Sequence, residues 1–397
     1  MNTPDYNYYN SIIKDETLPL AFVDINLLDK NITAIAERAG EKTIRVASKS
    51  VRNIWTLKHI FDSNPKYQGI MSFTGAEALF LIEQGFDNIL LGYPIVDKSQ
   101  IRNICKQTKA GKKIILMTDA IAHIQLINNI ANEEQVVQPI CIDVDMSSDF
   151  LGLHFGVYRS SVTNTSTAKK YINQLLNFKN IKLSALMGYE AQIAGVGDTN
   201  PANGIKNFAI KLLKKKSIPE YTQRRKEVVE YIKSKCDTLE IINAGGTGSM
   251  EWNKIEEGIT EITVGSGFFS PALFDYYTNF KHLPAAGFAL PIVRQPKDNM
   301  FTCLGGGYVA SGSTGVDKQP KPYLPEGIQI TENEGCGEVQ TPFVYKGNTN
   351  FKIGDAVFFR HSKAGELCER FNELYLIKDG KITDKVPTYR GMGKCFL

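Results

Sequence analysis

Two parts of the sequence are suited to bind an aldehyde and a phosphate. Lys49 follows a short apolar run that begins at Thr43. A lysine in such a place can attack a carbonyl carbon if partial burial depresses its pKa. The glycine-rich segment Gly245–Ser249 follows another short apolar run. Glycines let the backbone approach an anion closely, and the start of a helix offers free N–H groups to a phosphate. A surface lysine and a simple tight turn are the alternatives.

A second glycine turn strengthens the case for a phosphate site. The turn Gly265-Ser266-Gly267 follows the apolar run Glu261–Val264, the next run after the one that precedes Gly245. Glycine segments after two neighbouring runs are stronger evidence for a phosphate site than one alone. The sequence therefore predicts that the phosphate contacts come from Gly245, Gly246, Thr247, Gly248, Gly265 and Ser266.

The elements that would position these residues are eight short apolar runs, rich in β-branched side chains, between about residues 43 and 264. They are Thr43–Ser48, Gln68–Ser72, Asn88–Gly92, Lys113–Thr118, Pro139–Asp145, Leu183–Tyr189, Leu239–Ala244 and Glu261–Val264. Most are separated by segments with helical periodicity, which is typical of parallel strands joined by helices. Eight such units predict a (β/α)8 TIM barrel, and a doubly wound sheet is the alternative.

In such a barrel the active site lies at the carboxyl ends of the strands. Lys49 would follow the first strand, and the two glycine turns would follow the seventh and eighth. The lysine and the phosphate site would then bind the two ends of one ligand, an aldehyde that carries a phosphate. Pyridoxal 5'-phosphate has both groups.

The character of the sequence changes after about Asp275. Proline and glycine recur at short intervals, helical periodicity disappears, and short strand-like runs are separated by turns. This pattern predicts an all-β domain. The expected organisation is an N-terminal extension over residues 1–18, a barrel over 19–275 and a C-terminal β domain over 276–397.

Composition excludes several classes of protein. The formal net charge is only +4, so nucleic acid is not expected as a partner, and the basic stretch from Lys211 to Lys226 is interpreted as a solvated helix face. No apolar run is long enough to span a membrane, and the first residues have no signal-peptide pattern. The seven cysteines are an odd number, far apart and without a CxxC pair. Free thiols and a cytoplasmic location are therefore expected.

At this point the sequence resembles the fold type III pyridoxal-phosphate enzymes. Within them it is similar to the D-threonine aldolase and D-serine dehydratase-like family, whose barrel is of the alanine racemase N-terminal type, and most similar to a branch called amino acid deaminase/aldolase. The resemblance covers nearly the whole chain. Besides Lys49 and the glycine loops, it rests on Thr17–Asp24, Met187–Gly195, Leu304–Tyr308 and His361–Phe371.

The resemblance implies roles for individual residues. Lys49 would hold the cofactor, and Gly245–Gly248 would bind its phosphate. Tyr189 would lie near the cofactor and act in catalysis, with a packed barrel aromatic as the alternative. Gln192 follows on the same loop. Arg159 would contact the cofactor or a substrate carboxylate, or pair with Asp145.

The sequence departs from the family at a metal site. D-Threonine aldolase and D-serine dehydratase carry a His-x-Cys or His-x-Asp pair in the β domain, whereas residue two after His361 is Lys363. His361 and Cys368, with Glu366, are candidate ligands for zinc or manganese, and His361 is a candidate catalytic residue. Alternatively, the ammonium of Lys363 replaces the metal, or His361 and Cys368 are structural.

The resulting hypothesis is a pyridoxal-phosphate-dependent lyase that acts on a β-hydroxy D-amino acid. A racemase, with Tyr308 or Tyr389 as its second base, is the first alternative. A non-catalytic cofactor-binding protein is the second, although its small barrel relatives lack the β domain. His154 is a weaker acid–base candidate. A homodimer is expected by analogy with the fold.

Overall fold

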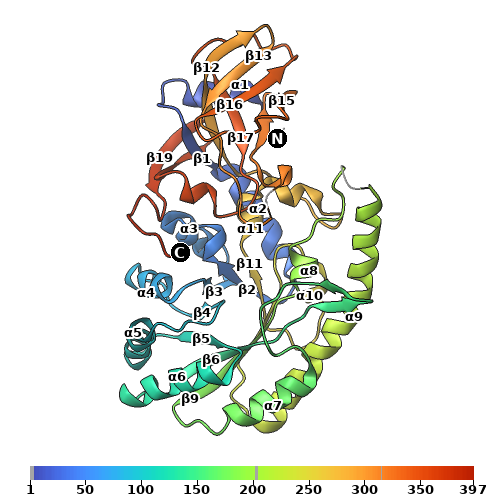
Figure 1. Ribbon diagram of the computed structural model, residues 1–397. Helices are drawn as coiled ribbons and strands as arrows, with labels where there is room; N and C mark the ends of the chain where they lie inside the picture. Colours follow the sequence, from blue (N-terminus) through green and yellow to red (C-terminus); the bar gives the residue numbers. More distant parts are fainter. Residues whose placement is uncertain (1–3, 202–203, 314) are drawn as a thin grey trace.

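The computed structural model describes residues 4–201, 204–313 and 315–397. Figure 1 shows a barrel with its surrounding helices below and a β domain above. Within the described ranges, no helix combines the length and apolar character needed to cross a membrane.

The lower unit is a closed barrel of eight parallel strands. All eight predicted runs form its strands, and pairing of the last with the first closes the ring. The prediction of a (β/α)8 barrel is confirmed. In ring order the strands are β2 (Thr43–Ala47), β3 (Tyr67–Ser72), β4 (Ile89–Leu91), β5 (Ile114–Thr118), β6 (Gln138–Asp143), β9 (Ile181–Gly188), β10 (Ile241–Ala244) and β11 (Glu261–Val264).

Successive residues of a barrel strand belong to two different clusters of buried side chains. On β5, Ile115 and Met117 belong to one buried cluster, whereas Ile114 and Leu116 belong to another that includes the apolar faces of the helices. Because successive strand residues point to opposite faces, the first pair fills the barrel and the second packs against the helices. Arg45, also fully buried, forms an ion pair with Glu261 on the neighbouring strand (2.6 Å).

The helices that surround the barrel begin at residues suited to cap them. Side-chain oxygens of Asp24, Asn53, Thr74, Asp97 and Asn164 accept backbone N–H groups in the first turns of five helices. The long helices are α2 (Ile25–Arg38), α3 (Ile54–Ser63), α4 (Gly75–Glu83), α5 (Lys98–Lys109), α6 (Ile121–Glu133), α7 (Thr165–Leu175) and α9 (Gly204–Lys235).

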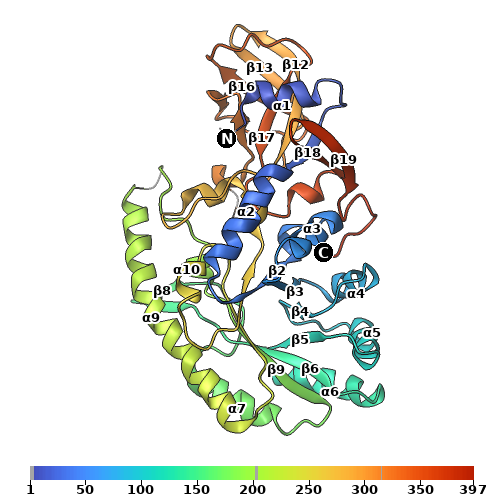
Figure 2. The ribbon, with the colours of Figure 1, turned by 180° about the vertical axis from the view of Figure 1, so that it is seen from behind.

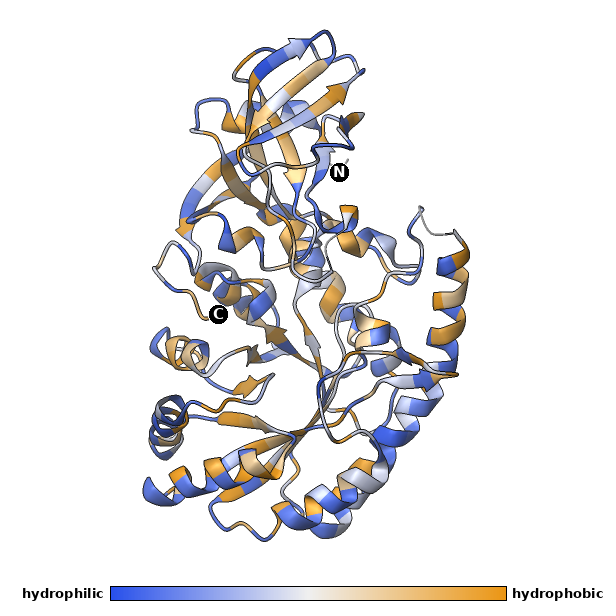
Figure 3. Ribbon diagram, viewed as in Figure 1, coloured by the Kyte–Doolittle hydropathy of each residue, from blue (hydrophilic) through white to orange (hydrophobic). Residues whose placement is uncertain are grey.

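Short elements complete the barrel mouth. A hairpin of β7 (Ser148–Phe150) and β8 (Leu153–Phe155) follows β6. Single helical turns follow several strands. The last two of them lead into the β domain. These turns are α8 (Ala191–Ala194), α10 (Met250–Asn253), α11 (Ser266–Phe269) and η2 (Ala272–Tyr276), while η1 (Ser48–Ser50) follows β2. Strands β5 and β6 are largely hydrophobic, whereas α9 has long hydrophilic stretches (Figure 3).

The β domain is a nine-stranded sheet with the order β15-β16-β13-β12-β1-β18-β19, and β17 pairs with β12 and β14. Its strands from the C-terminal part of the chain are β12 (Ala286–Lys297), β13 (Met300–Leu304), β14 (Lys321–Leu324), β15 (Ile328–Ile330), β16 (Gln340–Tyr345), β17 (Ala356–Arg360), β18 (Glu373–Lys378) and β19 (Lys381–Pro387). Two further helical turns lie in its loops, η3 (Val316–Lys318) and η4 (Leu367–Glu369).

The N-terminal segment also belongs to this sheet. Strand β1 (Leu20–Asp24) is antiparallel to β12 and parallel to β18, although the sequence places it with the barrel. All its residues are buried, so it needs cover on both faces. Helix α1 (Tyr6–Ile13) supplies one cover: the hydroxyl of Tyr9 donates to Asp24 (3.0 Å), and its ring packs on Phe22 and Phe358. Figure 2 shows α1 across the upper sheet.

This arrangement predicts that the N-terminal strand is required for stability. Phe22 is 1% exposed, so Phe22→Ala should lower the free energy of unfolding by about 3–5 kcal/mol, because it leaves a cavity in the β-domain core. Urea unfolding followed by circular dichroism measures the change. Ile353→Ala, at a residue of the same domain that is 62% exposed, is the control and should change little. Equal effects of the two variants would contradict this role of β1.

Candidate functional site

A cavity of about 420 Å³ opens at the carboxyl ends of the barrel strands, where the β domain meets them. Its walls include residues that follow six of the barrel strands, and two loops of the β domain contribute as well. Of the predicted site residues, the cavity is lined by Lys49, Arg159, Tyr189, Gly245, Gly246, Thr247, Gly265 and Ser266. Gly248 lies beside it, packed against Ala194 and Tyr277.

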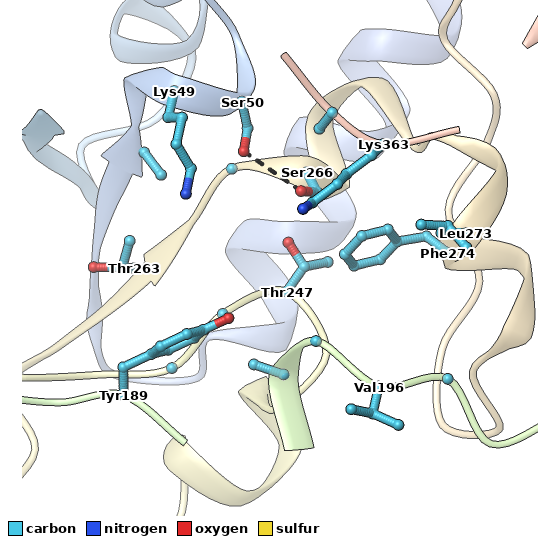
Figure 4. A pocket seen from close by; sticks show the side chains of 18 of the residues that line it. Lys49, Ser50, Tyr189, Val196, Thr247, Thr263, Ser266, Leu273, Phe274 and Lys363 are labelled. Carbon is cyan, nitrogen blue, oxygen red and sulfur yellow. Dashed lines mark hydrogen bonds between the residues drawn. The ribbon is translucent and has the colours of Figure 1, made fainter. Parts of the chain in front are cut away.

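Lys49 lies in the helical turn η1, between β2 and α3, and points into the cavity (Figure 4). Its ammonium donates to the hydroxyl of Tyr93 (2.9 Å). Burial alone would raise the pKa of Tyr93, but the charge of Lys49, its hydrogen bond and Arg159 together lower that pKa below its ordinary value. The two cations therefore favour the phenolate form of Tyr93 beside the Lys49 ammonium.

The β domain holds the turn that carries Lys49. Gly365 has a φ of +86°, and a Cβ atom there would lie 2.0 Å from the carbonyl oxygen of Lys49. Arg52 donates to the same carbonyl (3.0 Å) and forms an ion pair with Glu369. Cys368 donates through Sγ to the carbonyl of Val51 (3.2 Å). The segment His361–Phe371 therefore acts as a clamp on the lysine turn.

Arg159 forms part of an aromatic wall. It donates to Asp143 (2.8 Å) and to the carbonyl of Gly92 (2.8 Å), and its guanidinium carbon lies 5.1 Å from the ring centre of Tyr93 and 5.7 Å from that of Tyr189. Burial raises the pKa of Asp143 to about 6, although Arg159 opposes the rise. Burial likewise raises the pKa of Tyr189 to about 12, against the influence of Arg159.

One alternative for Arg159 is an ion pair with Asp145, and this alternative is wrong, because Arg159 pairs with Asp143. Asp143 occupies that place because it is the last residue of β6 and faces the barrel mouth. Asp145 instead accepts the backbone N–H of Ser147 (2.7 Å).

The two glycine segments lie side by side, as the pairing of β10 with β11 requires. Gly245 has a φ of +89°, which favours glycine. The N–H of Gly267 donates to the hydroxyl of Thr247 (3.0 Å), which joins the two turns. The N–H groups of Thr247 and Gly248 have no hydrogen-bond partner among the described residues. These unpaired donors suit a phosphate.

A buried network supports the first glycine segment from below. Glu190 accepts from the hydroxyl of Ser249 (2.6 Å), from Asn253 (2.7 Å) and from Arg225 (2.6 Å), which also pairs with Glu256. Ser249 in turn accepts from the N–H of Gly246 (3.2 Å). The network thereby fixes the backbone that offers the free N–H groups.

The interpretation of the basic stretch as a solvated helix face is wrong at two residues. Arg225 is 1% exposed, and Lys214 is buried in an ion pair with Asp198 (3.1 Å). Carboxylates compensate both charges: Asp198 pairs with Lys214, and Glu190 and Glu256 pair with Arg225. Only such a partner makes a buried charge tolerable.

His361 does not reach the cavity. The side chain is 3% exposed, neither ring nitrogen has a partner among the described residues, and burial lowers its pKa to about 3. Cys368 donates to Val51, and burial raises its pKa to about 12. In the described chain no three His, Cys, Asp or Glu side chains come together as ligands. A metal that binds a substrate needs ligands at the cavity, whereas neither His361 nor Cys368 is part of the described cavity lining, so these two residues do not fit such a site.

Lys363 does line the cavity, opposite Lys49 (Figure 4). It stands on the same loop as His361, and its ammonium donates to the hydroxyl of Ser311 (3.2 Å). The β domain therefore presents a primary amine to the barrel mouth.

The remaining candidates lie elsewhere. Tyr389 is buried and donates to Glu77 (3.1 Å), while Tyr308 packs on Phe288 and Phe371. His154 stacks on Tyr158 in the exposed hairpin, and Gln192 is buried, donating to the carbonyl of Met146 (2.6 Å). None of these four candidates is part of the described cavity lining.

Further lining residues were not predicted from the sequence. Tyr93 directly follows the third apolar run, Asn88–Gly92, and this position was the signal that could have identified it. The start of α9 and the turn η2 also contribute, and their distance from strand ends explains the omission. These residues are Lys206, Asn207, Ile210, Leu273, Phe274 and Tyr276.

Comparison with known proteins shows a shared fold. No protein-family model and no curated sequence matches the chain. Among solved structures, D-threonine aldolase from Filomicrobium marinum is similar at 14% identity, with a TM-score of 0.80 over 98% of this chain and 99% of that one.

Two further structures are similar over most of the chain. D-threo-3-hydroxyaspartate dehydratase from a Delftia species has 14% identity and a TM-score of 0.74, covering 95% of this chain and 98% of that one. Alanine racemase of Clostridium difficile, in complex with cycloserine, has 13% identity and a TM-score of 0.63, covering 94% and 99%. The chain therefore has the fold of the fold type III pyridoxal-phosphate enzymes.

The network below the glycine segment predicts a measurable effect on ligand affinity. Glu190→Gln keeps the shape of the side chain but removes a charge that compensates Arg225. The substitution should lower the free energy of unfolding by about 1–3 kcal/mol. The dissociation constant of pyridoxal 5'-phosphate, from its absorbance, should rise, and thermal stability should fall. Glu230→Gln, on the exposed side of α9, is the control. Unchanged affinity in Glu190→Gln would contradict this role.

Proposed function

We propose that this protein is a pyridoxal 5'-phosphate-dependent lyase that acts on a β-hydroxy D-amino acid. The observation that carries the proposal is a cavity with a lysine amine on one wall and, nearby, the unpaired N–H groups of Thr247 and Gly248 in the first of two joined glycine turns. The similar structures named D-threonine aldolase and D-threo-3-hydroxyaspartate dehydratase support it, because both names describe lyases of β-hydroxy D-amino acids.

The residues present fit the cofactor. The backbone of Gly246–Gly248 and the hydroxyl of Ser266 would hold its phosphate, and Lys49 would hold its aldehyde carbon. Any Cβ at Gly246 would lie 2.8 Å from that of Ala194, which shows how closely this loop is packed. When bound, pyridoxal phosphate accepts the electrons of a bond that breaks at the α-carbon of an amino acid.

The chain's own residues would move the protons. The amine of Lys49 must be neutral to act as a nucleophile, and the phenolate form of Tyr93, which its lowered pKa favours, lies at 2.9 Å, where it would accept the proton and become the neutral phenol. Tyr189, whose pKa is raised to about 12, stays protonated and can only donate a hydrogen bond near neutral pH. Arg159 keeps both phenols in place.

The positions of two tyrosines favour a lyase over a racemase. A racemase needs two bases on opposite faces of the α-carbon. Lys49 and Tyr93 are hydrogen-bonded to each other, and Tyr308 and Tyr389 lie outside the described cavity lining.

We further propose a cytoplasmic homodimer. Every cysteine is a free thiol, as suits a reducing compartment. Exposed apolar side chains gather on the hairpin and on the neighbouring helix α9, and a second copy of the chain would cover them. They are Leu151, Leu153, Tyr158, Ile205, Phe208 and Leu212. Sedimentation equilibrium should give twice the monomer mass, and a monomer at all concentrations would contradict the dimer.

Attachment of the cofactor to Lys49 is directly testable. The protein with added pyridoxal phosphate should absorb in the visible range, and reduction with borohydride should fix a pyridoxyl group on Lys49, located by peptide mass spectrometry. Lys49→Ala should abolish both the absorbance and cleavage of D-threonine or D-serine. Labelling of another lysine would overturn the assignment.

Activity should not depend on a divalent metal. Because His361 and Cys368 lie outside the described cavity lining and the thiol of Cys368 donates to the carbonyl of Val51, dialysis against a chelator should leave lyase activity within about twofold. Loss of activity on chelation, restored by zinc or manganese, would contradict this prediction.

A further inference from the structure

The side chains that line the cavity carry an excess of positive charge. Five of them are cationic, and one, Asp317, is anionic. The cations are Lys49, Arg159, Lys206, Lys318 and Lys363. A ligand of this cavity must therefore bring several negative charges.

Three of the five cations are already accounted for. Arg159 is paired with Asp143, and Lys318 forms an ion pair with Asp317. Lys49 is the amine that would hold the cofactor. Lys206 and Lys363 form no ion pair with any described carboxylate, and of these two Lys363 lies in the electrostatic neighbourhood of Lys49 and Tyr93.

The loop that carries Lys363 is anchored on both sides. Ser362 donates to the carbonyls of Asp317 (2.6 Å) and Gln319 (3.0 Å). Gly365 packs on the carbonyl of Lys49. The backbone at Lys363 is therefore fixed, and its side chain extends into the cavity opposite the amine of Lys49.

The ammonium of Lys363 forms no ion pair with a described carboxylate, although Glu366 acts on its charge from beyond ion-pair distance. Glu366, on the same loop, uses one carboxylate oxygen to accept the N–H of Ser311 (2.7 Å). Burial lowers the pKa of Lys363, and although Glu366 and Tyr93 oppose this, Lys49 and Lys318 lower it further. An anion bound at this place would relieve the repulsion among the three lysines.

We propose that Lys363 binds a second carboxylate on the side chain of the substrate, so that the substrate is a 3-hydroxy dicarboxylic D-amino acid. The cofactor phosphate is supplied with donors by the glycine turns, so it does not need Lys363. This inference rests on the proposed function, because the amino acid class follows from the Lys49 site. The inference adds that the side chain of the substrate carries a negative charge.

Binding of two inhibitors that differ by one carboxylate tests the subsite without turnover. D-Malate and D-lactate are matched 2-hydroxy acids, and calorimetry on the cofactor-loaded protein gives both dissociation constants. We expect D-malate to bind roughly 10- to 100-fold more tightly, the usual effect of one hydrogen-bonded charge pair. In Lys363→Met this preference should fall to about threefold or less.

Two variants control the experiment. Lys363→Arg keeps the charge and should retain most of the preference. Lys352→Met removes an exposed lysine of the β domain outside the cavity lining and should retain all of it. Circular dichroism confirms that each variant is folded.

The possible results separate the alternatives. An unchanged preference in Lys363→Met overturns the inference. Equal weakening of D-malate and D-lactate overturns it too, since Lys363 would then bind the α-carboxylate. Turnover adds a second readout: kcat/KM for D-3-hydroxyaspartate relative to D-threonine should fall at least tenfold in Lys363→Met. Failure to cleave any amino acid would refute the proposed lyase, while the ratio of binding constants would still decide whether the subsite exists.

Discussion

The contact between Gly365 and the carbonyl group of Lys49 is the constraint on which the site depends. It brings a loop of the β domain onto the turn that ends the first barrel strand, with no room for a side chain between them. Arg52 and Cys368 add hydrogen bonds at the same turn. The lysine amine therefore leaves a backbone that two domains hold, and such a group loses little entropy when it is positioned for reaction.

The opposite end of the cavity depends on buried charge. Arg225 is enclosed between Glu190 and Glu256, and Glu190 also holds Ser249 and Asn253 beneath the glycine segment. A buried charge is stable only when every partner is in place, so the network allows few arrangements of the loop above it. Rigid N–H groups bind an anion better than mobile ones, because their orientation is settled before the anion arrives.

The similar structures share the architecture at about 14% identity, so very different side chains fill the same core. Packing rules explain this tolerance, since a barrel requires only apolar residues of suitable volume on alternating faces. Chemistry is decided by a few residues at strand ends and in the clamp. Lys363 illustrates the point: one residue in a β-domain loop changes the charge that the cavity offers to a substrate.

The sequence by itself determined the barrel and the two ends of the cavity. Alternating β-branched runs and helical segments are local patterns that the sequence records. Because parallel strands bring their carboxyl ends to one face, the sequence alone places Lys49 and the glycine turns together. Only the tertiary structure decided the rest. Contacts between segments distant in sequence decide where four features lie. They place β1 in the β sheet, Lys363 in the cavity, His361 outside it and Arg225 in the interior. Such contacts are set by how whole surfaces pack and how buried charges find partners, and no local pattern of residues records them.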